Sequence, residues 1–344
     1  MGKKELKETQ KIASRIENKW YDEWIEQNIE DLTGKVAIVT GANSGTGFWA
    51  SNALAGKGCH VVLACRNEEK AKVAKDEITK RFSQAKLTFI PLDNNSFQSV
   101  RAFAKVFHEK FDRLDMILNN AGIMNQPWSI TKDGYDVQLQ TNHLSHFLLT
   151  KLLWNKIVNT PGQSRVVQHA SLAHKMGKLK FDADRLKNPS YSAGLMGSNF
   201  LFMNTIGLLL SSSAKRYGVS KLANVLFMRD LQRKISIKKL EHKIISIACH
   251  PGWADTNLPN TSTSWLSKYL RNNPQKGQSA ADGSLPLLMA AVGKRVENGD
   301  YLGPENGMTG APKKDKVGGN GNDAKMAETL WDFSEKAIKE KFII

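Results

Sequence analysis

A repeated alternation of short β-branched runs with longer amphipathic stretches, which begins near residue 33, constrains the fold more than any other feature. Each strand in such a pattern is followed by a crossover helix, and right-handed crossovers place successive strands parallel in one sheet. We therefore predict an α/β fold, a doubly wound parallel sheet with helices on both faces in a single domain. The predicted strands are Lys35–Thr40, His60–Ala64, Leu87–Pro91, Leu114–Asn119, Ser164–Ala170 and Lys243–Cys249. The predicted helices are Thr46–Lys57, Asn67–Phe82, Ser96–Lys110, Gly134–Val158 and Ser213–Lys234.

The first predicted strand ends in a glycine-rich turn, Thr40–Gly47 (TGANSGTG), which leads into the first predicted helix. Glycine allows positive φ angles and leaves no Cβ to block a phosphate, while a helix N-terminus offers free N–H groups and positive dipole charge. At the head of a βα series this turn predicts a dinucleotide site. The alternative is a tight βα turn without a ligand. The predicted phosphate-binding residues are Gly41, Asn43, Ser44, Gly45, Thr46 and Gly47.

The end of the second predicted strand indicates which nicotinamide cofactor fits. A carboxylate at this point binds the ribose 2′-hydroxyl of NAD, whereas an arginine accommodates the 2′-phosphate of NADP. The strand ends in Ala64-Cys65-Arg66-Asn67, with no acidic residue before Glu68. Because guanidinium geometry suits phosphate, Arg66 predicts NADP(H). The alternative is that Arg66 is an ordinary solvated residue closing the strand.

The composition excludes several classes of protein. The 344-residue chain has 41% hydrophobic residues, enough to bury a core and to exclude global disorder. It carries 49 Lys and Arg against 33 Asp and Glu, a net charge of +16. Nucleic-acid binding predicts a dense basic stripe with stacking aromatics, whereas these cations are scattered along predicted helix faces. We predict a solvated basic surface, a few cations reserved for an anionic cofactor, and no nucleic-acid partner.

The cysteines and the first residues indicate a compartment. Cys59, Cys65 and Cys249 are odd in number and form no CxxC or Cys/His cluster, so a disulfide scaffold and a structural zinc site are poor interpretations. The first 31 residues lack the apolar core of a signal peptide, and their eight acidic residues argue against a transit peptide. We predict a reduced, cytoplasmic protein, with a location peripheral to an intracellular membrane as the second hypothesis.

Two segments flank the predicted βα core. In residues 1–31, Ile12, Ile16, Trp20 and Trp24 recur every four residues, which predicts an amphipathic helix docked on the main body. Residues 311–344 are expected to supply a C-terminal loop and helix. The Gly- and Lys-rich stretch 304–322 predicts a surface loop, and 323–341 predicts the final helix.

Residues 188–214 contain no charged side chain. Several glycines and asparagines interrupt the segment, and the strands before and after it belong to one sheet, so a transmembrane span is a poor interpretation. We predict a semi-buried lid or insert. The alternative is peripheral contact with a membrane surface, because the segment is rich in Leu and also contains Phe, Met and Ile.

Motifs along the chain occur in the order seen in short-chain dehydrogenases/reductases, and the sequence resembles that family over about residues 32 to 310. LACRN, TNHLSHFLLT, SKLANVLF and HPGWADTNL look like the retinol dehydrogenase-like branch, which includes WW domain-containing oxidoreductases. The resemblance implies a Rossmann-type sheet in the order 3-2-1-4-5-6-7, in one NADP(H)-binding domain over 32–310. It also implies hydride transfer between nicotinamide and a small lipophilic alcohol or carbonyl compound, such as a retinoid, a steroid, an aldehyde or a ketone. The shared motifs are TGANSGTG, Asn119-Asn120-Ala121-Gly122, Asn142, Ser171, Tyr217-Gly218-Val219-Ser220-Lys221 and Pro251-Gly252.

The resemblance implies a catalytic tetrad of Asn142, Ser171, Tyr217 and Lys221. Hydride transfer to a carbonyl requires protonation of the developing alkoxide, and Tyr217 is the candidate acid in reduction and base in oxidation. Lys221 lies one helical turn further on, where an ammonium favours phenolate. Ser171 follows the fifth strand and can hold the substrate oxygen, while the matching asparagine of the family, here Asn142, anchors a water that relays protons to the lysine.

Further cofactor contacts are implied by the same resemblance. Asp93 is expected at the adenine, although it is also a candidate helix cap before Ser96. Residues near the ends of the later strands are expected along the ribose and around the nicotinamide, and Tyr217 and Lys221 are counted as cofactor contacts too. The remaining predicted contacts are Asn94, Asn120, Ala121, Gly122, Pro251, Gly252 and Thr256.

The chain departs from the family pattern at two places. Thr46 stands where the family usually has Ile or Leu, and 46 residues separate Ser171 from Tyr217, more than is usual. A long insert before the tyrosine also occurs in light-dependent protochlorophyllide reductases. Those enzymes carry a cysteine shortly after the lysine, whereas here that stretch reads Leu222-Ala223-Asn224, so that interpretation is weaker.

The remaining histidines and the fold also allow other functions than hydride transfer. His143 and His146 lie three apart, but with no third ligand we predict packing and no metal. His169 and His174 flank Ser171 without the acid partner and nucleophile elbow of a hydrolase. The rival functions are a non-catalytic NADP(H)-binding scaffold or sensor, and a hydrolase or isomerase on the same fold. Helices 134–158 and 213–234 match those that pair subunits in relatives, so a homodimer is a further hypothesis.

Overall fold

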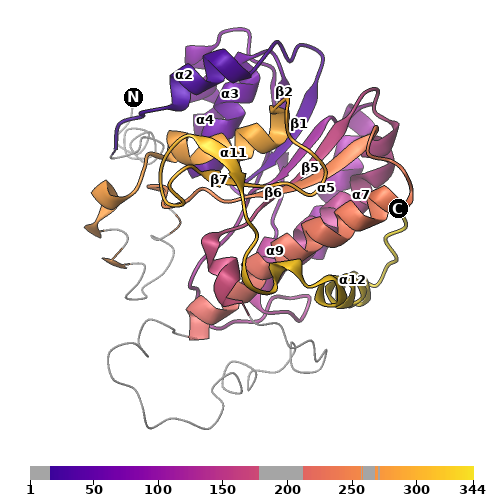
Figure 1. Ribbon diagram of the computed structural model, residues 1–344. Coiled ribbons are helices and arrows are strands. Elements are labelled where there is room, and N and C mark those ends of the chain that lie inside the picture. The colour runs from indigo at the N-terminus through magenta and orange to yellow at the C-terminus, as the bar shows by residue number, and fades with distance from the viewer. Residues whose placement is uncertain (1–15, 178–211, 257, 259–267, 270–271) are drawn as a thin grey trace.

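The computed structural model describes residues 16–177, 212–256, 258, 268–269 and 272–344 (Figure 1). They contain one sheet in the order β3-β2-β1-β4-β5-β6-β7-β8, in which all pairs are parallel except the antiparallel pair β7 and β8. The predicted order of seven strands is confirmed, and β8 extends it at one edge. The strands are β1 Val36–Thr40, β2 His60–Cys65, β3 Leu87–Pro91, β4 Met116–Asn119, β5 Ser164–His169, β6 Ile244–Cys249, β7 Tyr301–Pro304 and β8 Pro312–Asp315.

Strand β8 corrects the expectation that 304–322 is a loop. Tyr301 pairs with Asp315 and Pro304 with Pro312, so the chain returns along β7 within one hairpin. Its outward residues include Lys313 and Lys314, which are exposed. Lysines on an edge strand suppress pairing with other chains, which explains why a strand here carries a sequence that resembles a loop.

Helices cover both faces of the sheet, as predicted, and two apolar clusters separate the layers. One cluster contains side chains of α5, α7, α9 and α12, and the other contains side chains of α3, α4 and α11. Figure 1 shows α9 and α12 together on one side of the sheet and α2 with α3 on the other. The helices are α2 Tyr21–Asn28, α3 Gly45–Gly56, α4 Glu68–Arg81, α5 Phe97–Lys110, α6 Val137–Leu139, α7 Ser145–Asn159, α9 Ser212–Ile237, α11 Ala280–Val292 and α12 Ala324–Ile338.

The helix predicted over 134–158 begins three residues later than predicted, and it is not a regular α-helix before Ser145. The chain makes an isolated bridge between Ile130 and Asp136, and α6 begins only at Val137, where the Asp136 carboxylate accepts two backbone N–H bonds. A π-helical turn, Gln140–Leu144, then joins α6 to α7. A turn of this width is common at functional sites. Here it places Asn142 toward the loop that follows β4, where both polar atoms of its amide bond the backbone of Ile123.

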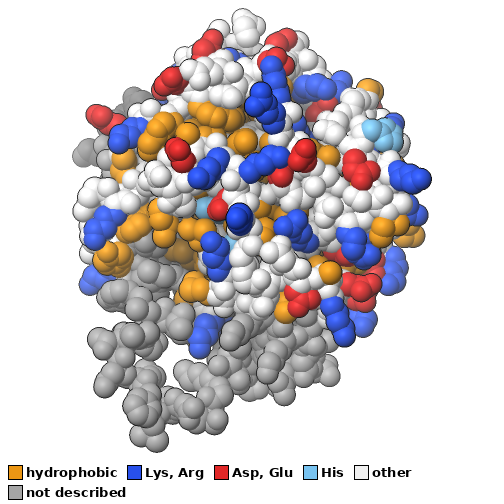
Figure 2. All heavy atoms as spheres, viewed as in Figure 1, with side chains coloured by type: hydrophobic (Ala, Val, Ile, Leu, Met, Phe, Trp, Pro, Cys, Tyr) orange, Lys and Arg blue, Asp and Glu red, His pale blue; other side chains and the backbone are white. Residues whose placement is uncertain are grey.

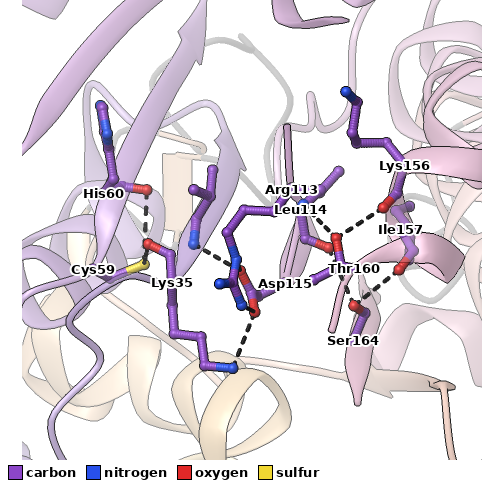
Figure 3. A network of polar contacts seen from close by, with 11 residues as sticks. Lys35, Cys59, His60, Arg113, Leu114, Asp115, Lys156, Ile157, Thr160 and Ser164 are labelled. Carbon is purple, nitrogen blue, oxygen red and sulfur yellow. Dashed lines mark hydrogen bonds and ion pairs between the residues drawn. The ribbon is translucent and has the colours of Figure 1, made fainter. Parts of the chain in front are cut away.

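The amino ends of β1 and β4 are joined by one carboxylate (Figure 3). Asp115 accepts hydrogen bonds from the Val36 backbone N–H at 2.9 Å and from two nitrogens of Arg113 at 2.8 and 2.6 Å. Lys35 adds an ion pair at 3.1 Å. This network lies at the amino ends of the strands, on the side of the sheet away from their carboxyl ends. Ligands of open α/β sheets bind at those carboxyl ends, so the Asp115 network stabilises the fold away from them.

Part of the predicted N-terminal amphipathic helix, which includes Ile12, lies outside the described residues. In the described part the helix starts at Tyr21, later than the four-residue periodicity predicts. Asp282 on α11 explains this start, because its carboxylate accepts the backbone N–H groups of Lys19, Trp20 and Tyr21, each at 2.9 Å. Tyr21 is 2% exposed, and its hydroxyl donates to the Trp49 carbonyl. A carboxylate from the main body thus acts as the N-cap of α2.

Replacing Asp282 with Ala is expected to lower the free energy of unfolding by about 2–4 kcal/mol, because one buried and two partly buried N–H groups lose a charged acceptor. Asp282 itself is 1% exposed, so water replaces the carboxylate poorly. Urea denaturation measures the change. Asp282→Asn keeps one oxygen acceptor and should lose less stability. Equal stability of Asp282→Ala and the native chain would show that the Asp282 cap does not stabilise the fold.

Helix α12 lies on α9, and its aromatic residues reach α7. Trp331 stacks on Phe342 with ring centroids 4.9 Å apart, and Phe147 of α7 meets both rings edge-on. These contacts occupy part of the surface formed by α7 and α9. Pairing of two subunits through these helices stays a hypothesis, and any such pairing would have to accommodate α12.

All three cysteines are free and buried. Burial raises the pKa of the Cys59 and Cys65 thiols to about 12 and that of Cys249 higher still.

Figure 2 shows Lys and Arg side chains interspersed with Asp and Glu over the visible face. Within the described ranges, no helix is both long enough and apolar enough to cross a membrane. Residues 188–211 of the predicted insert lie outside those ranges.

Candidate active site

A cavity of about 550 Å³ lies at the carboxyl ends of the central strands. The predicted site residues come from the turns after β1 to β6 and from α9, and the sheet brings almost all of them to this cavity. Two do not reach its wall. Gly47 lies behind the glycine turn, and Asn142 lies behind the loop that follows β4. The predicted residues that line the cavity are Gly41, Asn43, Ser44, Gly45, Thr46, Arg66, Asp93, Asn94, Asn120, Ala121, Gly122, Ser171, Tyr217, Lys221, Pro251, Gly252 and Thr256.

The glycine turn forms a cradle in which side chains have no room. Gly41 and Gly45 have φ angles of 69° and 57°, which favour glycine. A methyl group on Gly47 would lie 2.4 Å from Asn120 Nδ2 and 2.5 Å from the Gly41 carbonyl oxygen, closer than real contacts. The Ser44 side chain makes no capping bond to α3. The first N–H groups of α3 are therefore available to an anion.

Asn120 joins the glycine turn to the strands beside it. Its Nδ2 donates to the Thr40 carbonyl at 2.7 Å, so its Oδ1 is the acceptor for the Thr46 hydroxyl at 3.0 Å and for His169 Nδ1 at 2.7 Å. The unusual threonine of the glycine motif is thus hydrogen-bonded. Because the Thr46 hydroxyl is hydrogen-bonded to Asn120, a polar residue is accommodated at a position where the family usually has Ile or Leu.

Tyr217 and Ser171 meet at the cavity from different elements. Tyr217 lies on the second turn of α9, and Ser171 follows β5 and caps the 3₁₀ helix Leu172–Met176. Burial raises the pKa of Tyr217 to about 12, and a hydrogen bond with Ser171 opposes that rise. The tyrosine is therefore a neutral phenol at physiological pH, a proton donor held beside a second hydroxyl.

Lys221 lies one turn after Tyr217 and is 4% exposed. Its Nζ donates to the His169 carbonyl at 2.7 Å, and burial lowers its pKa to about 8. A methyl group on Gly122 would lie 3.4 Å from Lys221 Nζ and 3.2 Å from Asn142 Oδ1, so the two side chains approach each other beside Gly122. Asn142 also donates to Ser220 Oγ at 2.8 Å, which fixes it to α9.

Part of the cavity wall is polar. Arg66, directly after β2, is exposed and lines the cavity together with Asp93, after β3. Asp93 accepts the Asn95 backbone N–H at 3.0 Å, whereas Ser96 is the residue that caps α5. The alternative role of Asp93 as the helix cap is therefore wrong.

Another part of the cavity wall is apolar, and sequence reasoning did not identify it. Its residues follow β4, β5, β6 and β7, so loops distant in sequence combine to form it. HPGWADTNL pointed to Trp253 and Leu258 only through a family likeness, and nothing in the Gly- and Lys-rich stretch after β7 pointed to Met308. The apolar lining residues here are Ile123, Met124, Leu172, Met176, Trp253, Leu258 and Met308.

The histidines near the site are hydrogen-bonded within the protein. His143 bonds Ser334 Oγ at 2.8 Å, and His146 bonds both Thr40 and Asn94 at 2.9 Å. Burial lowers the pKa of His143 to about 3 and that of His146 to about 4, so both rings are neutral. In the part of the chain that the structure describes, no three His, Cys, Asp or Glu side chains gather as a metal site.

Comparison with known proteins yields one family model and many relatives. The model described as short chain dehydrogenase matches residues 35–193. Human retinol dehydrogenase 11 is 34% identical over 251 residues, which cover 72% of this chain and 71% of that protein. The WW domain-containing oxidoreductase of Danio rerio is 32% identical over 318 residues, covering 91% of this chain and 70% of that protein.

Solved structures share the fold. A protein from Mycobacterium paratuberculosis matches with a TM-score of 0.69 and 29% identity, covering 92% of this chain and 98% of that one. L-sorbose reductase from Gluconobacter frateurii, solved with NADPH and L-sorbose, matches with a TM-score of 0.57 and 18% identity, covering 81% and 97%. At that identity the second likeness shows the fold alone.

Proposed function

Because the chain belongs to the short-chain dehydrogenase/reductase family of oxidoreductases, in the retinol dehydrogenase-like branch, we propose that it is an NADP(H)-dependent enzyme that acts on a lipophilic alcohol or carbonyl compound. The observation that carries the proposal is the meeting of Tyr217, Ser171 and Lys221 in one cavity. The glycine cradle and the apolar wall line the same cavity. This arrangement provides a phosphate site, an acid and an apolar pocket within a single space.

The residues of the chain fit a dinucleotide. The cradle at Gly41 and Gly45 and the uncapped start of α3 suit the pyrophosphate, and Gly122, Pro251 and Gly252 line the path toward Tyr217. When bound, the nicotinamide supplies the hydride. The NADPH complex of L-sorbose reductase supports the same cofactor type on this fold.

Tyr217 donates the proton in reduction. Its raised pKa keeps the phenol protonated at neutral pH, and the Ser171 hydroxyl beside it orients the substrate oxygen. Lys221, charged below pH about 8, places a cation near the phenol and stabilises the phenolate that forms when the proton leaves. Asn142 fixes the loop after β4 beside Lys221. In oxidation the same groups act in reverse.

Arg66 should select NADP(H) over NAD(H). Replacing Arg66 with Gln is expected to raise KM for NADPH by about 10–100-fold, because a charge-assisted bond to the 2′-phosphate is worth about 1.5–3 kcal/mol. KM for NADH should change little. Steady-state kinetics with both cofactors measure the change. Lys80→Gln, at the other end of α4 where Lys80 pairs with Glu77, is the matched control for lost charge. An equal loss with both cofactors would contradict the role of Arg66.

The substrate class is tested by cofactor consumption. The purified protein with NADPH, or with NADP⁺, is offered retinoids, steroids, quinones and simple aldehydes, and the change in NADPH absorbance is followed. We expect turnover with long apolar substrates because Met124, Met176, Trp253 and Met308 form the wall. NADPH binding without turnover of any substrate would favour the rival function, a non-catalytic scaffold or sensor. Conversion of a substrate without a change in NADPH would favour a hydrolase or isomerase.

The remaining proposals concern organisation and location. We assign cofactor binding and catalysis to residues 32–310 and an accessory role to residues 1–31. Residues 311–344 supply the edge strand and α12.

Exposed Met176 and Met308 line the cavity, which suits substrates delivered from an apolar phase. We propose a cytoplasmic enzyme in which 188–214 is a lid or insert, with peripheral membrane contact through this segment as the alternative. Fractionation of cells expressing the chain with and without residues 193–210 tests this contact.

A further inference from the structure

Behind the loop after β6, a buried histidine pairs with a partly exposed aspartate, and the proposed reaction does not use this pair. His250 follows β6 and is fully buried, and its Nε2 lies 2.9 Å from Asp315 Oδ2 at the end of β8. On the other side of the ring, the Gly252 backbone N–H donates to His250 Nδ1 at 3.2 Å. One imidazole therefore connects the edge strand to a residue that lines the cavity.

These contacts define the state of the ring. Because a carboxylate only accepts, Nε2 carries the proton, and Nδ1 is left as the acceptor that Gly252 requires. Burial lowers the pKa of His250 and keeps the ring neutral, although Asp315 opposes this. Asp315 itself has a pKa below its usual range: burial opposes ionisation, but the bonds from His250 and from the Lys316 backbone outweigh it.

The ring has little freedom to turn. Tyr301 of β7 stacks on it with centroids 5.4 Å apart and planes at 27°. Gly303 of β7 approaches so closely that a methyl group there would lie 2.1 Å from His250 Nε2. Rotation would break both polar contacts and meet these neighbours. Because the ring is rigid, the position of the Asp315 carboxylate therefore determines where the acceptor of the Gly252 N–H lies.

Gly252 is under tight constraint on its other sides. Its φ is 62°, and a methyl group would lie 2.2 Å from the Met308 carbonyl oxygen. The neighbouring Trp253 backbone N–H donates to the same oxygen at 2.8 Å, and Gln278 Nε2 donates to the Pro251 carbonyl at 2.9 Å. Two sides of this loop are thus fixed by backbone and amide contacts, and His250 fixes the third.

We propose that Asp315 and His250 are a positioning pair for the nicotinamide half of the cofactor site, acting through the Gly252 backbone. The inference rests on the proposed function, because it assumes that Gly252 faces the nicotinamide. Without the pair, the Gly252 N–H loses its acceptor, and the loop is held only by the contacts of Pro251 and Trp253. The wall of the cavity then shifts at the point where hydride transfer requires accurate placement. The adenosine half, held near Arg66 and the glycine turn, lies far along the cavity and keeps its site.

The test compares two ligands on the full chain. NADPH carries both halves, whereas adenosine 2′,5′-bisphosphate carries only the adenosine half with its 2′-phosphate. In Asp315→Ala and His250→Phe we expect Kd for NADPH, from fluorescence titration, to rise about 5–30-fold, as the loss of about 1–2 kcal/mol implies. Kd for adenosine 2′,5′-bisphosphate should stay within about twofold of the native value. With substrate present, kcat should fall about 10–100-fold, since small displacements of reacting groups cost that much.

Three controls separate positioning from general damage. Asp315→Asn retains an acceptor oxygen and should keep most of the NADPH affinity. Lys314→Ala, on the same strand but paired with Glu297 and Asp300, should behave as the native chain. The double variant of Asp315→Ala and His250→Phe should lose little more than either single variant, because both act along one path.

The outcomes distinguish this inference from the proposed function. Native NADPH affinity in both Asp315→Ala and His250→Phe would overturn the positioning role, as would a parallel loss of affinity for adenosine 2′,5′-bisphosphate. Additive losses in the double variant would also contradict it. Failure of the native chain itself to bind NADPH would overturn the proposed function, and the positioning role with it.

Discussion

Tyr217→Phe is expected to lower kcat by about 10²–10⁴-fold, the usual contribution of a positioned acid, while NADPH still binds with nearly native affinity. In the proposed mechanism the phenol is the group whose proton neutralises the developing alkoxide, and phenylalanine keeps the ring but not the proton. Tyr217 is 7% exposed, so water has little access to replace it. Ser171 then remains beside the substrate oxygen without a donor that can complete the transfer.

Single-turnover measurements with the best substrate from the panel check this prediction, together with fluorescence titration of NADPH. Tyr135→Phe is the matched control, because its hydroxyl donates only to the Ala337 carbonyl, away from the cavity. We expect that variant to turn over at the native rate. Near-native turnover in Tyr217→Phe would exclude the phenol as the acid and would leave the proposed mechanism without a proton donor.

Lys221→Met is expected to abolish most activity and, at the same time, to make the cofactor-free protein more stable. Burial lowers the pKa of Lys221 from 10.5 to about 8, so the folded state holds this charge at a cost. At about 1.4 kcal/mol for each pKa unit, that cost is on the order of a few kcal/mol at neutral pH. Methionine fills a similar volume without charge, and Asn224 Nδ2 still donates to the His169 carbonyl at 3.1 Å.

The pH dependence follows from the sign of the shift. Because the folded pKa lies below the unfolded one, the native state binds fewer protons between pH about 8 and 10.5, and native stability should rise with pH over that window. The advantage of Lys221→Met should therefore be full below pH about 8 and shrink above it. In reduction, kcat/KM of the native enzyme should fall as pH rises through the same value, since the ammonium is lost.

Urea denaturation between neutral and alkaline pH measures the stability difference, and steady-state assays measure the activity. Lys238→Met, which changes an exposed lysine just beyond α9, should alter neither quantity. A less stable Lys221→Met at neutral pH would mean that the bond to the His169 carbonyl outweighs the cost of burying the charge. Unchanged activity would remove the lysine from the mechanism.

Strand and helix periodicity predicted the central part of this fold well, because each βα unit is a local pattern. The strand over Leu87–Pro91 has the predicted bounds, and the helices over 68–81 and 97–110 differ from prediction by a residue or two. Local pattern was insufficient to predict elements whose existence or bounds depend on tertiary contacts. Strand β8 exists because β7 offers a partner, and α2 begins at Tyr21 because Asp282, more than 250 residues away, caps it.

The candidate site was predictable to the extent that motifs mark it. The glycine turn, Ser171, Tyr217 and Lys221 were identified from sequence, and the sheet brings them to one cavity. The apolar wall was not, since Met308 reaches it through a loop that no motif marks. Nor does sequence show that Thr46 and His169 share the Asn120 amide oxygen, because that contact depends on how β1, β4 and β5 lie side by side.

The three buried thiols have a practical consequence for spectroscopy. A thiol reacts as its thiolate, and Cys59, Cys65 and Cys249 are shielded and have raised pKa values, so maleimide reagents should leave the folded protein unmodified. A single cysteine introduced at an exposed position of β8, such as Lys313→Cys, would then be the one reactive point on the molecule. A dye at that point would report on the edge strand during turnover without removal of any native cysteine.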